Sequence, residues 1–167
     1  MRASKVILVG AGPGDPELIS VKGLKAIQAA DVILYDALSS DELLSEASDS
    51  AELIYVGKRC TKHSLKQADI NALIYQKAKQ ASIVVRLKGG DPYIFGRGHE
   101  EQVYLEKRGI QVEVIPGISS VTSLASLQHV PLTRRGISES FWVMTGTTKD
   151  HQPVSYTHLT LPTIYSV

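Results

Sequence analysis

The sequence predicts an α/β fold in which a parallel sheet carries helices on both faces. Strand-like and helix-like segments alternate along most of the chain. Several strand-like runs, such as residues 6–9 and 32–35, are apolar at consecutive positions, which is typical of strands buried on both sides. Glycine-rich or polar turns follow the strands, and the carboxyl ends of parallel strands share one rim where ligands bind. We therefore expect a single binding cleft at that rim.

The individual elements follow from local signals. Ser20 is a plausible N-cap for the first helix, and the third helix has Ile70 and Ile74 at helical spacing. Gly109 suits the C′ position after the fourth helix. A further strand candidate covers residues 140–145. The sequence predicts strands at residues 5–9, 32–35, 52–56, 82–87 and 111–115, and helices at 19–30, 41–47, 67–80, 98–108 and 119–128.

Composition excludes several classes of function. The chain has 167 residues, and its hydrophobic (43%) and charged (21%) shares are ordinary for a soluble globular protein. A net charge of +1 gives no argument for a nucleic-acid partner, and no apolar run is long enough to span a membrane. Cys60 is the single cysteine, which fits the reducing cytoplasm, and the five histidines lack metal-ligand spacing. We expect a cytoplasmic protein without a metal site.

The loop at residues 10–16, GAGPGDP, resembles a nucleotide-binding turn but lacks the required spacing. A dinucleotide-binding fingerprint needs a glycine at position 15, where this chain has Asp15. Pro13 also removes a backbone N–H that would bind phosphate, and Asp15 would repel phosphate. The loop therefore suits a neutral or cationic ligand, although its glycines could equally serve only as a tight β–α turn.

The central loop, within RLKGGDPYIFGRGHEE at residues 86–101, gives the clearest signal of a binding site. Gly89 and Gly90 permit positive φ and close approach of a ligand to the backbone. Asp91 and Pro92 then turn the chain sharply. The clustering of glycines, prolines, arginines and an aspartate favours binding over a purely structural turn.

Three further candidates have structural alternatives. Asp36 ends the second strand and could simply cap the following segment. Lys58 and Arg59 follow the third strand and could be solvated side chains. From the residues alone, the chain is an α/β protein that binds a small molecule at one rim of its sheet.

Seven motifs carry a resemblance to a known family, the tetrapyrrole methylases, that is nearly continuous from residue 5 to about residue 151. They are VGAGPGDPELIS (9–20), ADVILYDALSS (30–40), VGKR (56–59), QADINALI (67–74), VVRLKGGDPYIFGRGHEE (84–101), VIPGISS (114–120) and VPLTRRGIS (130–138).

The resemblance implies a fold of two α/β domains, usually in a homodimer, with S-adenosylmethionine bound in the cleft between them. It also implies S-adenosylmethionine-dependent C-methylation of uroporphyrinogen III at two pyrrole rings. The product, reached through precorrin-1, would be precorrin-2, on the routes to sirohaem and cobalamin. The alternatives are another methyltransferase of this fold, or an inactive fragment that only binds a ligand.

The same motifs imply roles for individual residues. Asp36 resembles the proposed proton acceptor of the family and Lys58 the proposed proton donor. The carboxylate of Asp91 would attract the cationic sulfonium and amino groups of S-adenosylmethionine. The eight carboxylates of the substrate would be bound by cationic side chains. The implied cofactor contacts are Pro13, Gly89, Gly90, Asp91, Ile94, Ser119 and Ser120, and the implied substrate-binding cations are Arg59, Arg97, Arg134 and Arg135.

The chain departs from the family pattern at three places. Arg134 stands where histidine is usual, and His99 stands where glycine is commonest. The family continues well beyond this chain, whereas residues 152–167 contain no Asp, Glu, Lys or Arg and do not match it. We expect an N-terminal domain at 1–135, the start of a truncated second domain at 136–151, and a foreign tail at 152–167 of vector or assembly origin. Such a chain should bind the cofactor weakly and have little activity.

Overall fold

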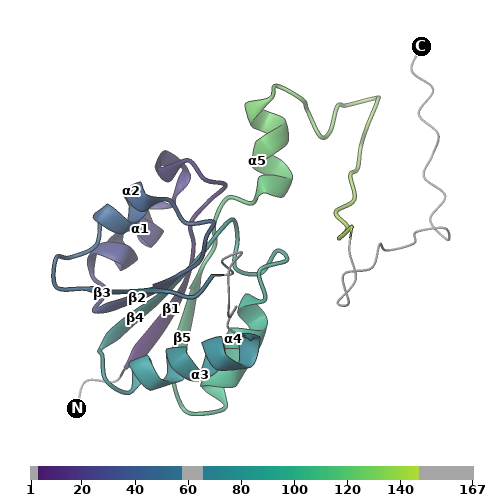
Figure 1. Ribbon diagram of the computed structural model, residues 1–167. Coiled ribbons are helices and arrows are strands. Elements are labelled where there is room, and N and C mark those ends of the chain that lie inside the picture. The colour runs from purple at the N-terminus through teal and green to yellow at the C-terminus, as the bar shows by residue number, and fades with distance from the viewer. Residues whose placement is uncertain (1–3, 58–65, 147–167) are drawn as a thin grey trace. The chain divides into compact units, whose positions relative to one another are not determined.

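A computed structural model describes residues 4–57 and 66–146 of the chain. Its five strands form one sheet in the order β3-β2-β4-β1-β5, and every neighbouring pair is parallel (Figure 1). The predicted α/β class is therefore confirmed. The strands are β1 (Lys5–Gly10), β2 (Val32–Tyr35), β3 (Glu52–Tyr55), β4 (Ile83–Lys88) and β5 (Gln111–Ile115), and the helices are α1 (Val21–Gln28), α2 (Asp41–Ser45), α3 (Gln67–Ala78), α4 (Gly98–Glu106) and α5 (Ser120–Leu127), with a 3-10 turn at Pro16–Leu18.

Helices cover both faces of the sheet, which explains the consecutive apolar residues in its strands. Ile7 and Val9 of β1 pack into one cluster that includes Ile27 of α1, and α2 adds to the same side. Val6 and Leu8 alternate with them and pack into the opposite cluster, which α3 and α4 complete. Figure 1 shows α1 and α2 on one side of the sheet and α3 and α4 on the other.

Two predicted helix termini are confirmed in atomic detail. The Oγ atom of Ser20 accepts a hydrogen bond from the backbone N–H of Gly23 at 3.0 Å, which caps α1. Gly109 has a φ of +79°, and its N–H donates to the carbonyl of Glu106 while Ile110 donates to Leu105. This pair of hydrogen bonds is the Schellman motif that ends a helix at a C′ glycine.

The strand predicted at residues 140–145 is wrong, because the described residues there form no strand. The side chains of Phe141, Trp142, Val143 and Met144 are between 38% and 60% exposed. Within the described part of the chain no layer buries their apolar surface, so the β-propensity of this run has nothing there to pack against.

The chain divides into two compact units after Leu132. The first unit contains the whole sheet, and the described part of the second contains a tight turn in which Arg134 and Ser138 exchange backbone hydrogen bonds around Gly136. The predicted domain limits and the foreign tail stay predictions. No helix in residues 4–57 or 66–146 is both long and apolar enough to cross a membrane.

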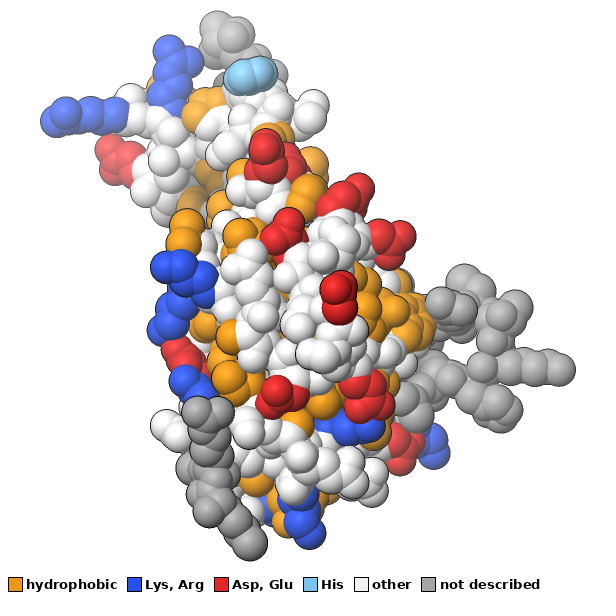
Figure 2. All heavy atoms as spheres, turned by 90° about the vertical axis from the view of Figure 1, so that its left-hand side faces the viewer, with side chains coloured by type: hydrophobic (Ala, Val, Ile, Leu, Met, Phe, Trp, Pro, Cys, Tyr) orange, Lys and Arg blue, Asp and Glu red, His pale blue; other side chains and the backbone are white. Residues whose placement is uncertain are grey.

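The outer surface carries charges of both signs. Figure 2 shows acidic, basic and hydrophobic side chains interspersed on one face of the molecule. A mixed surface of this kind is what a net charge of +1 leads one to expect.

Candidate functional site

The loops after β1 and β4 meet at the carboxyl end of the sheet. Gly90 donates its N–H to the carbonyl of Gly12 at 2.7 Å, and Gly12 donates in return at 3.3 Å. Beyond β1 the chain continues toward α1, whereas beyond β4 it continues toward α4 on the opposite face. Neighbouring strands whose connections diverge in this way leave a crevice between them, which is the usual ligand site of open α/β sheets.

Glycines allow the loops to pack against one another. A β-carbon on Gly10 would lie 2.5 Å from the Cα atom of Gly117, and one on Gly117 would clash with the carbonyl oxygen of Gly90. A β-carbon on Gly89 would clash with the side chain of Leu38, in the loop after β2. Gly90 itself has a φ of +65°, and a β-carbon there would meet only the Cα atom of Ser119 at 3.9 Å. These glycines therefore hold the loops together and leave backbone exposed to a ligand.

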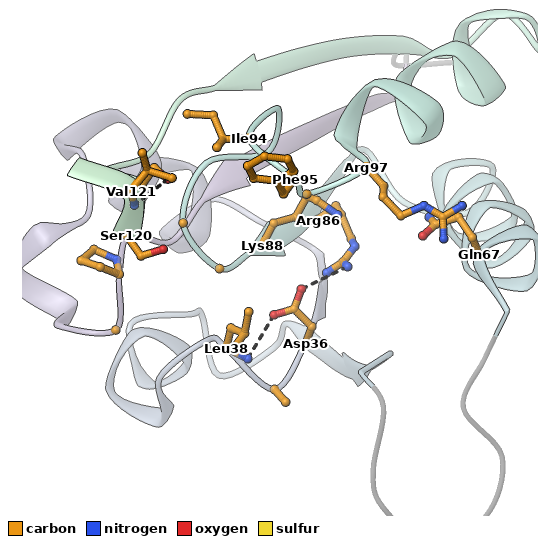
Figure 3. Close-up of a pocket in the computed structure, with 17 residues that line it drawn as sticks. Asp36, Leu38, Gln67, Arg86, Lys88, Ile94, Phe95, Arg97, Ser120 and Val121 are labelled. Atoms are coloured by element: carbon orange, nitrogen blue, oxygen red, sulfur yellow. Dashed lines mark hydrogen bonds and ion pairs between the residues drawn. The ribbon is translucent and has the colours of Figure 1, made fainter. Parts of the chain in front are cut away.

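A cavity of about 710 Å³ lies between these loops, a size that suits a nucleoside-sized ligand (Figure 3). Most of the predicted site residues line it together, although their motifs lie far apart in the sequence. The predicted residues that line the cavity are Pro13, Asp36, Gly89, Gly90, Ile94, Arg97, Ser119 and Ser120.

The other predicted residues are placed differently. Asp91 directly follows Gly90 but does not line the cavity. Lys58 and Arg59 lie outside the described residues, so their roles stay predictions. Arg134 and Arg135 belong to the second unit of the chain, and their predicted substrate contacts also stay predictions.

The carboxylate of Asp91 joins two of the loops. Its Oδ1 atom accepts from the backbone N–H of Tyr93 at 2.8 Å, and its Oδ2 atom accepts from the N–H of Gly117 at 3.1 Å. Asp91 therefore ties the loop after β4 to the loop after β5, whatever electrostatic effect it has on a ligand.

Asp36 lies at the end of β2 and faces the cavity with its side chain 22% exposed. Its Oδ1 atom accepts from the N–H of Leu38 at 3.2 Å in a local turn. The N-cap of the following helix α2 is Ser40, so the alternative that Asp36 caps that segment is wrong. Its Oδ2 atom is 3.3 Å from NH2 of Arg86. Each carboxylate oxygen can accept a second hydrogen bond, so Asp36 retains capacity to bind a ligand N–H.

Arg97 lies on the rim and forms a two-point contact with a carboxylate of its own helix. Its Nε and NH2 atoms donate to Glu100 at 2.9 and 2.7 Å. The hydrogen bonds that Arg97 donates to the Glu100 carboxylate raise the pKa of Arg97 above its usual value. The guanidinium is therefore a permanent cation at the mouth of the cavity.

The rim loop before α4 holds unusual backbone conformations. Phe95 and Arg97 have φ values of +52° and +57°, a region that costs a residue with a β-carbon roughly 1–2 kcal/mol. Gly96 and Gly98 leave no room for a β-carbon, which would lie 2.7 and 2.5 Å from the carbonyl oxygen of Pro92. Strain of this kind concentrates at functional sites.

The sequence analysis missed a set of charges at the cavity, which we call the buried charge cluster and which consists of Arg86, Lys88 and Glu101. Arg86 and Lys88 line the cavity, and Glu101, which does not, contacts both. The side chains of Arg86 and Lys88 are each 5% exposed and that of Glu101 is 0% exposed. A signal was available, because Arg86 and Lys88 are two positions apart in an otherwise apolar strand and so share one face.

Burial changes the ionisation of the cluster. Desolvation lowers the pKa of Lys88 below its usual value, and the neighbouring charge of Arg86 lowers it further. Glu101 opposes both effects, through its negative charge and a hydrogen bond to the ammonium group of Lys88. The protonation of Lys88 therefore depends on its two partners in the cluster.

Comparison with known proteins identifies the family to which this fold and sequence belong. Residues 5–162 match the family described as tetrapyrrole (corrin/porphyrin) methylases, a range that extends into the segment we expect to be foreign. The chain is 59% identical over 142 residues to the uroporphyrinogen-III C-methyltransferase of Methanocaldococcus jannaschii, a match that covers 85% of this chain and 59% of the relative.

Two solved structures share the fold. Uroporphyrin-III C-methyl transferase from Thermus thermophilus, complexed with S-adenyl homocysteine, superposes with a TM-score of 0.76 at 41% identity, covering 90% of this chain and 59% of that one. A cobalt precorrin-4 methyltransferase superposes with a TM-score of 0.78 at 30% identity, covering 92% and 61%. The chain thus spans about three-fifths of the length of each of these three proteins. From its sequence motifs, its sheet and these matches, the chain belongs to the tetrapyrrole methylase family.

Proposed function

We propose that the chain forms part of the cofactor-binding and substrate-binding site of an S-adenosylmethionine-dependent C-methyltransferase that acts on uroporphyrinogen III. The observation that carries the proposal is the shared cavity, which gathers eight residues from motifs spread between Pro13 and Ser120. The names of the Methanocaldococcus and Thermus proteins support the substrate, and the S-adenyl homocysteine in the latter complex supports the methyl donor.

The residues present fit such a donor. Gly90 offers backbone without a β-carbon, and Pro13 lacks the N–H that a phosphate would need. Ser119 and Ser120 lie at the start of α5 on the same cavity. When bound, S-adenosylmethionine supplies a methyl group activated by a positively charged sulfur. A site with the carboxylate of Asp36 and no phosphate-binding turn suits that charge.

The chain contributes mainly position and proton transfer. In the proposed reaction a carbon–carbon bond forms between the pyrrole and the methyl group, the carbon–sulfur bond breaks, and the pyrrole nitrogen loses a proton. Holding the reactants in line is worth effective molarities of about 10⁵ M or more. Asp36 would accept the proton, which adds about 10²–10⁴-fold, and Lys58 would act as proton donor.

Cations around the cavity would bind the carboxylates of the substrate. Arg97 is the described candidate with a planar fork of donors at the cavity mouth, and a substrate carboxylate would share or replace its contact with Glu100. Arg59, Arg134 and Arg135 are further candidates. We also propose a cytoplasmic homodimer, with a product that serves sirohaem or cobalamin synthesis.

A second candidate is a sibling methylase that acts on a later corrin precursor. The similarity to cobalt precorrin-4 methyltransferase favours it, although at lower identity than the uroporphyrinogen relatives. The third is a fragment that binds the ligand without turnover.

Calorimetry and mass spectrometry separate these candidates. Purified chain should bind S-adenosylmethionine, although weakly, and not NAD. The little methyl transfer that we expect from it should go to uroporphyrinogen III and not to cobalt-precorrin-4. Asp36→Asn should slow the transfer, whereas Asp41→Asn, on α2 and away from the cavity lining, should not. Binding of NAD would refute the proposal, methylation of cobalt-precorrin-4 would favour the sibling, and cofactor binding without any transfer would favour the fragment.

A further inference from the structure

Glu101 collects three donors on one oxygen atom. Its side chain projects from the first turn of α4 and is fully buried. The Oε1 atom accepts from Nε2 of Gln67 at 3.1 Å, from Nζ of Lys88 at 3.1 Å and from Nε of Arg86 at 3.4 Å. One carboxylate thereby connects the start of α3, the end of β4 and the start of α4.

Arg86 extends this connection to the cavity. Its NH1 atom donates to the carbonyl of Leu87 at 2.7 Å, and its NH2 atom lies 3.3 Å from Oδ2 of Asp36. Figure 3 shows the guanidinium of Arg86 directed at Asp36. Because the guanidinium is planar and rigid, fixing its Nε edge at Glu101 also fixes the direction of the nitrogen that reaches Asp36.

The charges of this region balance only when Glu101 is present. Two buried cations, Arg86 and Lys88, face two carboxylates, Asp36 and Glu101. Removing one member of such a buried set leaves an uncompensated charge and frees its partners to reorient. Without Glu101, the carboxylate of this set that remains among the described residues is Asp36, and it would face both Arg86 and Lys88.

Glu101 also follows closely on the strained rim loop. Gly98, the first residue of α4, donates its N–H to the carbonyl of Pro92 at 2.9 Å, and Phe95 and Gly96 between them line the cavity. Glu101 lies three residues after Gly98, so its contacts with Arg86 and Lys88 link the loop before α4 to the side chains of β4 that line the cavity.

We propose that Glu101 is a positioning residue, which holds Arg86 so that Arg86 orients the carboxylate of Asp36 toward the ligand. The inference rests on the proposed function in one respect, the role of Asp36 as proton acceptor. Glu101 itself is not among the residues that line the cavity.

The test compares Glu101→Gln with Glu106→Gln in the full chain. The first variant keeps the shape of the side chain and one acceptor oxygen but removes the charge. The second removes the same charge from an exposed position on the same helix. Nitrogen-15 NMR reports on the exchange of the Arg86 Nε–H with solvent and on the titration of the Lys88 ammonium. Methyl transfer to uroporphyrinogen III and titration calorimetry with S-adenosylmethionine report on function.

In Glu101→Gln we expect the Arg86 Nε–H to exchange faster and the titration midpoint of Lys88 to fall. The rate of methyl transfer should drop about 10- to 100-fold, as for a misplaced catalytic group, while the affinity for S-adenosylmethionine changes by less than about threefold. Glu106→Gln should match the wild type in every measurement. Glu101→Asp, which restores the charge on a shorter side chain, should recover part of the lost rate.

Equal Arg86 exchange in Glu101→Gln and Glu106→Gln would overturn the proposal, and so would equal transfer rates. If Glu101→Gln does not fold, the wild-type spectrum decides, because an anchored Arg86 Nε–H must exchange more slowly than that of free arginine. A wild-type chain without methyl transfer would count against the proposed function alone. The exchange and titration data would still decide whether Glu101 holds Arg86.

Discussion

Gly10 and Gly117 lie so close together that a β-carbon on Gly10 would stand 2.5 Å from both the Cα and the nitrogen atom of Gly117. The two residues end β1 and follow β5, and the carbonyl oxygen of Gly90 lies within 3 Å of where that β-carbon would be. Three loops therefore meet at a point where only backbone atoms fit.

Gly117→Ala should loosen this junction. The added methyl group would clash with the carbonyl of Gly90, and overpacking of this kind costs about 1–3 kcal/mol of unfolding free energy. Urea denaturation would measure the loss. Gly146→Ala is the matched control, since a β-carbon there meets nothing within 4 Å. A Gly117→Ala chain as stable as this control would show that the loops can separate without penalty.

Phe95→Gly should stabilise the fold and weaken ligand binding at once. Phe95 is 63% exposed and has a φ of +52°, so glycine would relieve backbone strain with little loss of burial. We expect a gain of about 1 kcal/mol or less. His129→Gly, at a φ of +58° outside the cavity lining, should give a similar gain without changing the affinity for S-adenosylmethionine. Equal affinities in both variants would mean that Phe95 makes no contact with the ligand.

Asp91→Asn separates a structural role of Asp91 from an electrostatic one. In asparagine an NH2 group replaces the oxygen that accepts from the N–H of Gly117. Two donors would then face each other, and that hydrogen bond would be lost. We expect the affinities for S-adenosylmethionine and for S-adenosylhomocysteine, whose sulfur is uncharged, to fall by the same factor, about tenfold or about 1.4 kcal/mol. Titration calorimetry would measure both, with exposed Asp49→Asn as control. A loss confined to S-adenosylmethionine would instead show that Asp91 acts on the sulfonium charge.

Lys88→Met should change how stability depends on pH. The pKa of folded Lys88 is lowered from 10.5, so between that lowered value and 10.5 the unfolded chain holds a proton that the folded chain has released. Unfolding free energy therefore rises with pH across this window, and below it Lys88 contributes no slope. Urea denaturation at a series of alkaline pH values should give a flatter curve for Lys88→Met than for Lys107→Met, an exposed control. Parallel curves would mean that Lys88 titrates normally in the folded chain.

The fold was predictable because its signals are local. Consecutive apolar residues in β1 and β2 report burial on both faces, and Ser20 and Gly109 cap helices through contacts within a few residues. The failure at residues 140–145 has the opposite cause. Strand propensity says nothing about whether a neighbouring layer exists to cover the strand, and among the described residues none covers this one.

The loops around the site were predictable from the sequence, but the buried charge cluster was not. Glycine and proline constrain the backbone by themselves, so the loops after β1 and β4 stand out in the sequence. The contact of Glu101 with Arg86 spans fifteen residues and depends on how α4 packs against β5 and α3, which no local pattern encodes. The strain at Phe95 was equally hidden, because phenylalanine seldom adopts a left-handed conformation.

The buried charge cluster sets a limit for anyone who wishes to make this protein more heat-resistant. Replacing a buried ionic set by apolar side chains of similar volume is often neutral or stabilising by about 1–4 kcal/mol. A redesign of Arg86, Lys88 and Glu101 guided by stability alone would favour such a replacement. The resulting chain would melt at a higher temperature and leave Asp36 without the guanidinium that faces it. Screens for thermostable variants of this domain should therefore also test the proposed methyl transfer at every round.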